Sequence, residues 1–165
     1  LTAVENVMVG AERSARAGVL SALLGLPRSD RDERRLRQRA LDALAELGVA
    51  DVADRRPGTL PFGVQKRVAL ARALVAEPEL LLLDEPAGGL SAADLEELGR
   101  RVRALRGRMS VLLVEHHMDL VMSVCDRVVV LDFGRCVAAG TPAEVQSDQR
   151  VLDAYLGVEA GDAGG

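Results

Sequence analysis

The stretch Leu80-Leu81-Leu82-Leu83-Asp84-Glu85-Pro86 decides the fold. Its four leucines form an apolar run of strand length, which is typical of a strand covered on both faces in the parallel sheet of an α/β domain. Four leucines could equally belong to a helix. Pro78 before the run and the Asp84-Glu85-Pro86 turn after it leave too little room for a helix, so the run is predicted to be a strand.

Strands and helices alternate after this run. The pattern predicts, in order, a helix over 92–105, a strand over 111–114, a helix near 118–124 and a strand over 128–131. Such alternation implies right-handed crossovers and a parallel sheet. Phe133-Gly134 is predicted to turn the chain into a hairpin strand over 136–139. Helices near 142–147 and 149–156 then precede a Gly-rich end, 158–165, that is expected to be disordered.

Before the leucine run the pattern is helical. Apolar residues at helical spacing predict a helix over 2–9, a charged helix from Ser29 to Leu47 that opens with a capping signal at Ser29 or Asp30, and a helix after residue 65 that runs to Ala76. The arginines of the charged helix are interleaved with acidic residues, so they are interpreted as a solvated face. We therefore divide the chain into a helical part, 1–76, and an α/β part, 77–157.

Composition excludes several classes of function. The net charge is −4 and the pI near 5.3, so no excess of basic residues attracts a nucleic acid, and any nucleotide site must be local. Aromatic residues are almost absent, which predicts a core of Leu, Val and Ala. Cys125 and Cys136 are interpreted as small buried hydrophobes, since no C-x-x-C pair is present. No apolar run approaches the ~20 residues that span a bilayer, which favours a cytosolic chain.

Ionisable residues follow two of the predicted strands. Asp84 and Glu85 end the first strand, and Glu115-His116-His117 follow the second. Ligands of open parallel sheets bind beyond the carboxyl ends of the strands. There Asp84 could hold Mg²⁺ through its water shell, Glu85 could polarise an attacking water, and a neutral His116 could hydrogen-bond a phosphate. The alternative is that Asp84 and Glu85 simply end a strand and cap the next turn.

Four motifs in order resemble the nucleotide-binding subunits of ABC transporters: residues 60–65, 80–85 and 88–91, and then His116. The resemblance implies a partial P-loop NTPase (RecA-like) α/β core plus an ABC helical subdomain, with ATP and Mg²⁺ as cofactors. It makes Asp84 the Walker B aspartate, Glu85 the catalytic glutamate and His116 the switch histidine. It also makes Gly88, Gly89 and Ser91 part of the D-loop.

By the same resemblance, the signature loop contacts the γ-phosphate held by the other subunit. Its residues are Leu60, Pro61, Phe62, Gly63, Val64 and Gln65. The usual signature Ser is Pro61 here, the first usual Gly is Phe62, and Ser91 stands where the D-loop usually has Asp. Pro61 has no hydroxyl or backbone N–H to give a phosphate, so the contact would have to come from Gly63 and later amides.

Within the family, the opening residues 1–7, the stretch 112–122 and the ending 140–157 resemble the ATPases of branched-chain amino-acid importers. Lipopolysaccharide-export ATPases share part of the ending. The expected partners are a sister ATPase in a head-to-tail dimer and transmembrane permease subunits, at the cytoplasmic face of the inner membrane. No G-x-x-x-x-G-K-[ST] loop is present, and the chain opens on Leu1, so we expect a fragment that is inactive alone.

Two further hypotheses stay open. A DNA-organising ATPase head shares the signature and Walker B, but the helix from Ser29 to Leu47 is far too short for its coiled coil. A non-catalytic partner module would contribute only the signature loop to an intact ATPase, and the missing phosphate loop is its best support.

Overall fold

The computed structural model describes residues 1–12 and 30–151. The chain divides into two compact units, Leu1–Val114 and Glu115–Gly165. Each unit is described by itself. The boundary between the helical and α/β parts at residue 76 stays a prediction, as does the disordered end, which lies outside the described residues.

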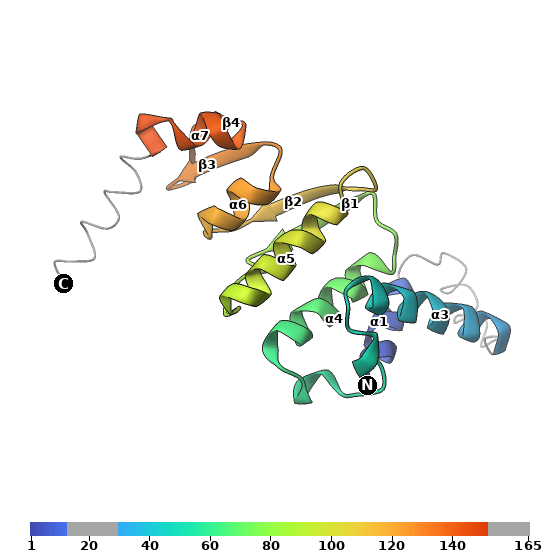
Figure 1. Cartoon of the computed structure of the whole chain (residues 1–165). Helices are drawn as coiled ribbons and strands as arrows, with labels where there is room; N and C mark the ends of the chain where they lie inside the picture. The colour runs from blue at the N-terminus through green and yellow to red at the C-terminus, as the bar shows by residue number, and fades with distance from the viewer. Residues whose placement is uncertain (13–29, 152–165) are drawn as a thin grey trace. The chain divides into compact units, whose positions relative to one another are not determined.

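Three helices pack together in the first unit: α1 (Ala3–Glu12), α3 (Asp30–Glu46) and α4 (Phe62–Leu74) (Figure 1). Short 3₁₀ helices at Ala50–Val52 and Pro57–Thr59 connect α3 to α4. Val4, Val7, Leu44 and Leu47 are almost completely buried in this unit. The buried hydrophobic residues of the described chain are all Ala, Val or Leu, which confirms the predicted core composition.

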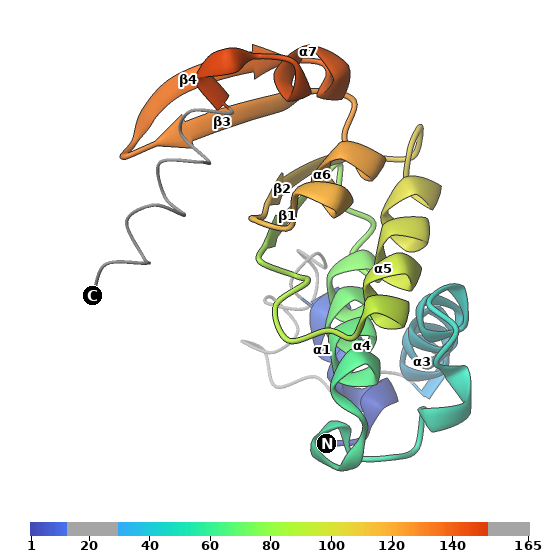
Figure 2. The ribbon, with the colours of Figure 1, turned by 60° about the vertical axis from the view of Figure 1, so that its left-hand side comes forward.

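A parallel strand pair follows the helices. Strand β1 (Leu80–Asp84) leads through α5 (Ala92–Ala104) to β2 (Ser110–Val114), and α5 runs beside the two strands (Figure 2). The strands pair in parallel, with Leu80 opposite Ser110 and Asp84 opposite Val114. The carboxyl ends of both strands therefore meet at one edge of the sheet, as the sequence predicted.

The expectation that β1 is covered on both faces is wrong for the described chain. Leu81 is 4% exposed, but Leu80 is 54% and Leu82 is 65% exposed, and Leu112 and Val114 on β2 are also exposed. Neighbouring side chains of a strand point to opposite faces, so one face of this pair is covered and the other is open. Among the described residues of the first unit, no second helical layer covers the open face, as it would in a doubly wound sheet.

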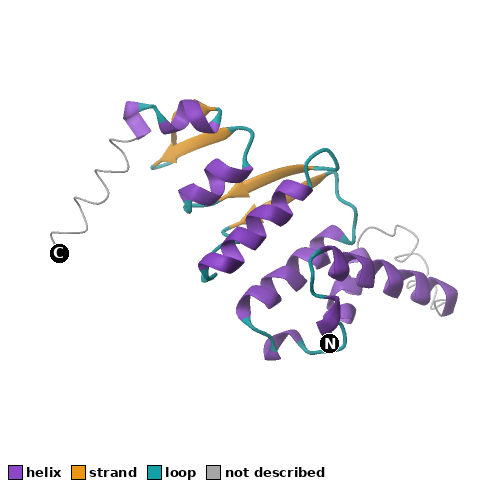
Figure 3. Ribbon diagram, viewed as in Figure 1, coloured by secondary structure: helices purple, strands orange, loops and turns teal. Residues whose placement is uncertain are grey.

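The second unit is built from α6 (Met118–Val124), β3 (Val128–Asp132), β4 (Arg135–Gly140) and α7 (Pro142–Gln146) (Figure 3). Strands β3 and β4 form the predicted antiparallel hairpin, with an irregularity between Val130 and Leu131. Val121, Val128, Ala138, Val145 and Val151 form its hydrophobic core.

The prediction that the third run extends the parallel sheet is wrong for the hydrogen bonding of the described strands. Strand β3 pairs with β4 in a separate two-stranded sheet. The tight turn at Phe133 and Gly134, which have φ angles of 43° and 77°, places β4 along one edge of β3, and no described strand pairs with the other edge.

The two cysteines differ in their exposure. Cys125 is half-buried and Cys136 is exposed, so the interpretation of both as buried hydrophobes is wrong for Cys136, which lies on the exposed hairpin.

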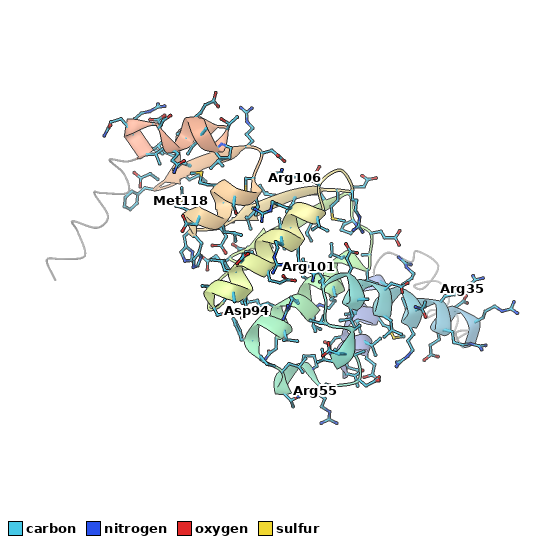
Figure 4. All side chains as sticks on the ribbon, in the orientation of Figure 1. Arg35, Arg55, Asp94, Arg101, Arg106 and Met118 are labelled. Carbon is cyan, nitrogen blue, oxygen red and sulfur yellow. The ribbon has the colours of Figure 1, made fainter. Side chains whose placement is uncertain are left out.

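Arg35 projects from α3 into solvent, as expected for a solvated face (Figure 4). The capping signal at Ser29 and most of the helix predicted over 149–156 lie outside the described residues. Among the described helices, none combines the length and apolar character that crossing a bilayer requires.

Helix α7 begins with a capping box, which carries a pH prediction. The Thr141 backbone N–H and hydroxyl donate to Oε2 of Glu144 at 2.8 and 3.0 Å, and they hold the pKa of Glu144 below its ordinary value of 4.5. A pKa lowered by folding stabilises the fold above the unfolded-state value, and this stabilisation is lost as the pH falls through the folded-state value.

We therefore expect the thermal unfolding midpoint of the wild type to exceed that of Glu144→Gln near neutral pH, and the difference to shrink between about pH 5 and pH 3. Thermal unfolding followed by circular dichroism measures it. A difference that stays constant over this range would contradict the proposed cap.

Candidate functional site

Asp84 and Glu85 lie at the carboxyl edge of the parallel strand pair. Asp84 is the last residue of β1 and pairs with Val114 of β2. The Glu85 N–H donates to the carbonyl of Val114 at 2.9 Å, so the main chain of Glu85 is held by the neighbouring strand. Both side chains are exposed at this edge.

The backbone of Glu85 is in the left-handed region, with a φ angle of 43°. Residues other than glycine rarely adopt this conformation, and it costs of order 1–3 kcal/mol. The hydrogen bond to Val114 and one from the Gly88 N–H to the Glu85 carbonyl, at 3.3 Å, fix the turn in which this strain is held. Strained residues of this kind cluster at functional sites.

The alternative interpretation, in which the two carboxylates cap the turn after β1, receives no support. Neither the Asp84 nor the Glu85 carboxylate makes a hydrogen bond or ion pair with another residue within the ranges 1–12 and 30–151. The turn is closed by backbone groups instead. The two carboxylates thus remain available to a ligand.

The segment 60–65 contains the start of α4, which begins at Phe62 and not after residue 65 as the sequence predicted. Pro61 is the N-cap residue and makes no side-chain capping hydrogen bond. The N–H groups of Val64 and Gln65 both donate to the Pro61 carbonyl at 3.0 Å, and the side chain of Gln65 donates to the Leu60 carbonyl at 2.8 Å. The first amides of an α-helix have no intrahelical acceptor and attract negative charge. Because the Val64 and Gln65 amides are already engaged and no side chain caps this helix, the amides of Phe62 and Gly63 are the ones open to an anion within the described residues.

Phe62 links this loop to the turn after β1. Its side chain is 48% exposed. A Cβ added to Gly89 would lie 3.0 Å from Cε1 of Phe62, so the ring lies directly against the Gly89 backbone. Lys66 Nζ lies 5.3 Å from the centroid of the Phe62 ring, in cation–π range.

Gly63 and Ser91 meet at Asp94, which lies at the start of α5 beside α4 (Figure 4). A Cβ added to Gly63 would lie 2.5 Å from the carboxylate of Asp94. The Ser91 hydroxyl donates to Asp94 Oδ2 at 2.7 Å and accepts from the Asp94 N–H at 3.2 Å, which caps α5. The first unit thus brings together the residues predicted for the signature loop and the D-loop.

His116 lies at the start of the second unit, in the turn before α6. Its side chain is 67% exposed, and its ring centroid lies 4.3 Å from that of His117. Glu115 Oε2 accepts from the N–H of His116 at 3.0 Å and from the N–H of His117 at 3.2 Å. The exposed imidazole therefore stands on a turn that a neighbouring carboxylate holds.

The sequence did not reveal the structural roles of Asp94 and Glu115. Asp94 follows Ser91 at the spacing of a helix cap, and this signal could have been found. Its contact with Gly63 joins segments far apart in the chain and had no local signal. Glu115 was named only as a neighbour of His116, because nothing in the sequence shows where its carboxylate points.

The residues at the strand edge fit a magnesium nucleotide. Mg²⁺ prefers oxygen ligands and keeps several waters, so a single exposed carboxylate such as that of Asp84 suits it. The open amides at the start of α4 suit a phosphate. The strand edge and the start of α4 belong to the same unit, whereas His116 belongs to the other.

Comparison with known proteins agrees with these features. The family described as ABC transporter matches residues 2–88, and the family described as branched-chain amino acid ATP-binding cassette transporter matches residues 135–161. The first match covers more than half of the chain, including the loop at 60–65 and both carboxylates.

Two curated relatives resemble most of the chain. The high-affinity branched-chain amino acid transport ATP-binding protein BraF of Pseudomonas aeruginosa is 38% identical over 159 residues, which are 95% of this chain and 62% of that protein. The lipopolysaccharide export system ATP-binding protein LptB of Acidithiobacillus ferridurans is 37% identical over 147 residues, which are 88% of this chain and 60% of that protein. The chain therefore spans less than two thirds of either relative.

The fold is also found among solved structures. An ATP-binding cassette of an ABC transporter in its ADP conformation superposes with a TM-score of 0.76 at 27% identity, over 95% of this chain and 63% of that one. The α/β architecture with a parallel strand pair is therefore that of a partial P-loop NTPase core.

Proposed function

The chain belongs to the ABC transporter family, and from that premise we propose that it is the C-terminal part of an ATP-hydrolysing subunit that energises the import of branched-chain amino acids. The observation that carries the proposal is the exposed, unengaged pair Asp84 and Glu85 at the edge where β1 and β2 end. In the same unit, the uncapped start of α4 lies within the signature loop.

Each of these residues has a defined part in the proposal. The Asp84 carboxylate holds the hydrated Mg²⁺ of the nucleotide. The bound metal neutralises the negative charge of the phosphates. Glu85 accepts a proton from the attacking water or orients it, and the exposed His116 imidazole hydrogen-bonds the phosphate. The strained turn at Glu85 fixes the main chain from which its carboxylate extends.

The signature loop is proposed to act on the ATP of a sister subunit. The Gly63 amide faces the γ-phosphate of that ATP, and the positive end of α4 favours its charge. ATP would then join two subunits head to tail. Phe62 against Gly89 and Gly63 against Asp94 support this arrangement, because they tie the signature loop and the D-loop into one surface.

The transported solute is proposed from similarity alone. The match over residues 135–161 and the relative BraF both carry branched-chain amino acid transport in their descriptions. The helical part, residues 1–76, is proposed to dock onto transmembrane permease subunits at the cytoplasmic face of the inner membrane. An ATPase of lipopolysaccharide export is the second candidate, supported by the 37% identity with LptB.

The experiment uses the complete subunit, which also carries the phosphate-binding loop that the proposal requires. We expect its ATP turnover to depend on Mg²⁺ and to fall about 100-fold in Asp84→Asn, because the substitution removes the charge that holds the metal. Phosphate release at a series of Mg²⁺ concentrations measures it. Asp54→Asn, at an exposed aspartate distant in sequence from the strand edge, is the control and should hydrolyse ATP normally.

Equal turnover in the wild type and Asp84→Asn would contradict the proposed metal site. A stable, functional complex between this chain alone and an intact ATPase would instead favour a partner module that supplies only its signature loop.

A further inference from the structure

The turn after β2 contains a carboxylate with no part in the proposed reaction. Although Glu115 follows an exposed strand end, its side chain is 0% exposed. Charged side chains are almost never fully buried unless they are paired. The buried Glu115 carboxylate therefore needs hydrogen-bond donors nearby, and His116 and His117 supply them.

Three nitrogen atoms, two of them backbone N–H donors, converge on one oxygen of Glu115. Oε2 lies 3.0 Å from the N of His116, 3.2 Å from the N of His117 and 2.9 Å from Nδ1 of His117. Hydrogen bonds from backbone N–H groups to a carboxylate are stronger than those between neutral groups. The Glu115 carboxylate is thus hydrogen-bonded to the main chain of both histidines.

These hydrogen bonds restrain His116, the residue that carries the exposed imidazole. His116 lies between β2 and α6, where the main chain leaves the sheet, and its own side chain is 67% exposed. With its N–H held by Glu115 and the His117 ring 4.3 Å from its own ring, the backbone and side chain of His116 are both restricted.

We infer that Glu115 is a positioning residue: its buried carboxylate holds the His116 turn so that the imidazole is presented in one orientation to the phosphate. The inference rests on the proposed function of His116. It extends that function by assigning the orientation of His116 to Glu115, which does not itself touch the nucleotide.

A metal site at the same residues is the less favourable interpretation. Ligand atoms of Glu115, His116 and His117 lie within 4.8 Å of one another. However, Glu115 Oε2 already accepts two backbone N–H groups and contacts His117 Nδ1. A cation bound between them would compete with these hydrogen bonds for the same Glu115 oxygen.

The test is a double-mutant cycle in the complete subunit. We expect Glu115→Ala to lower kcat for ATP hydrolysis by about 30- to 100-fold, because a misplaced catalytic group can cost about 100-fold. The KM for ATP should stay within about twofold, since the lost interaction serves the chemical step. If Glu115 acts through His116, Glu115→Ala combined with His116→Ala should be no slower than His116→Ala alone.

Two further variants separate positioning from general damage to the fold. Glu115→Gln keeps an oxygen that can accept both backbone N–H groups, so it should recover at least about tenfold of the kcat lost in Glu115→Ala. Glu96→Ala, at an exposed glutamate on α5, should match the wild type. Circular dichroism of each variant checks that it is folded.

Each outcome supports or overturns the inference. Wild-type turnover in Glu115→Ala, additive losses in the double variant, or equal kcat in Glu115→Gln and Glu115→Ala would overturn it while leaving the role of His116 intact. Wild-type turnover in His116→Ala would overturn both the inference and the part of the proposed function on which it rests.

Discussion

The substitution Glu85→Gln in the complete subunit is expected to reduce ATP turnover by about 100- to 10,000-fold, which is the range contributed by general acid–base groups. Glutamine matches glutamate in size but cannot accept a proton from the attacking water. Its backbone can keep the φ angle of 43° and the hydrogen bond to Val114, so the turn after β1 should remain in place.

ATP binding should survive the same substitution, because the proposed grip on the nucleotide comes from other groups. Phosphate release measures turnover, and equilibrium dialysis with labelled ATP measures binding. Glu79→Gln is a matched control, since Glu79 is an exposed glutamate just before the other end of β1. Unchanged turnover in Glu85→Gln would rule out Glu85 as the general base.

The second large effect is expected in the helical part of the first unit. Gly10 in α1 lies against α4, and a Cβ added there would be 2.0 Å from the carbonyl oxygen of Arg72. In an ordinary helix interior, replacing glycine by alanine gains up to about 1 kcal/mol. Here the methyl group has no room against the backbone of α4. We expect Gly10→Ala to lower the free energy of unfolding by about 1–3 kcal/mol, the typical cost of overpacking.

Urea unfolding followed by circular dichroism measures this effect as a lower midpoint at an unchanged slope. Gly58→Ala is the control, because a Cβ at Gly58 meets nothing within 4 Å. Its free energy of unfolding should change by less than about 0.5 kcal/mol. A Gly10→Ala variant that is more stable than the wild type would contradict the close packing of α1 on α4.

The sequence predicted the elements well where local signals are strong. The leucine run between Pro78 and Asp84 becomes β1, its parallel pairing with β2 is confirmed, and the turn at Phe133 and Gly134 makes the expected hairpin. These features depend on residues close together in the chain. Their apolar runs and turn residues carry enough information to place them.

Predictions that depended on distant parts of the chain succeeded less often. The exposure of Leu82 depends on which layers cover the sheet, and the pairing of β3 with β4 alone depends on competition between partner strands. Neither is encoded in the local pattern. The site shows the same division: the order of motifs was readable, whereas the contact of Gly63 with Asp94 and the burial of the Glu115 side chain follow from tertiary packing.

The most direct test of the whole account is the molar mass of the Glu85→Gln subunit in solution, measured by sedimentation with and without ATP and Mg²⁺. We predict a monomer without nucleotide and a dimer with ATP, because each signature loop is proposed to bind the γ-phosphate held by the other subunit and hydrolysis no longer separates them. A mass that is the same with ATP as without it would contradict the proposed ATP-driven dimer.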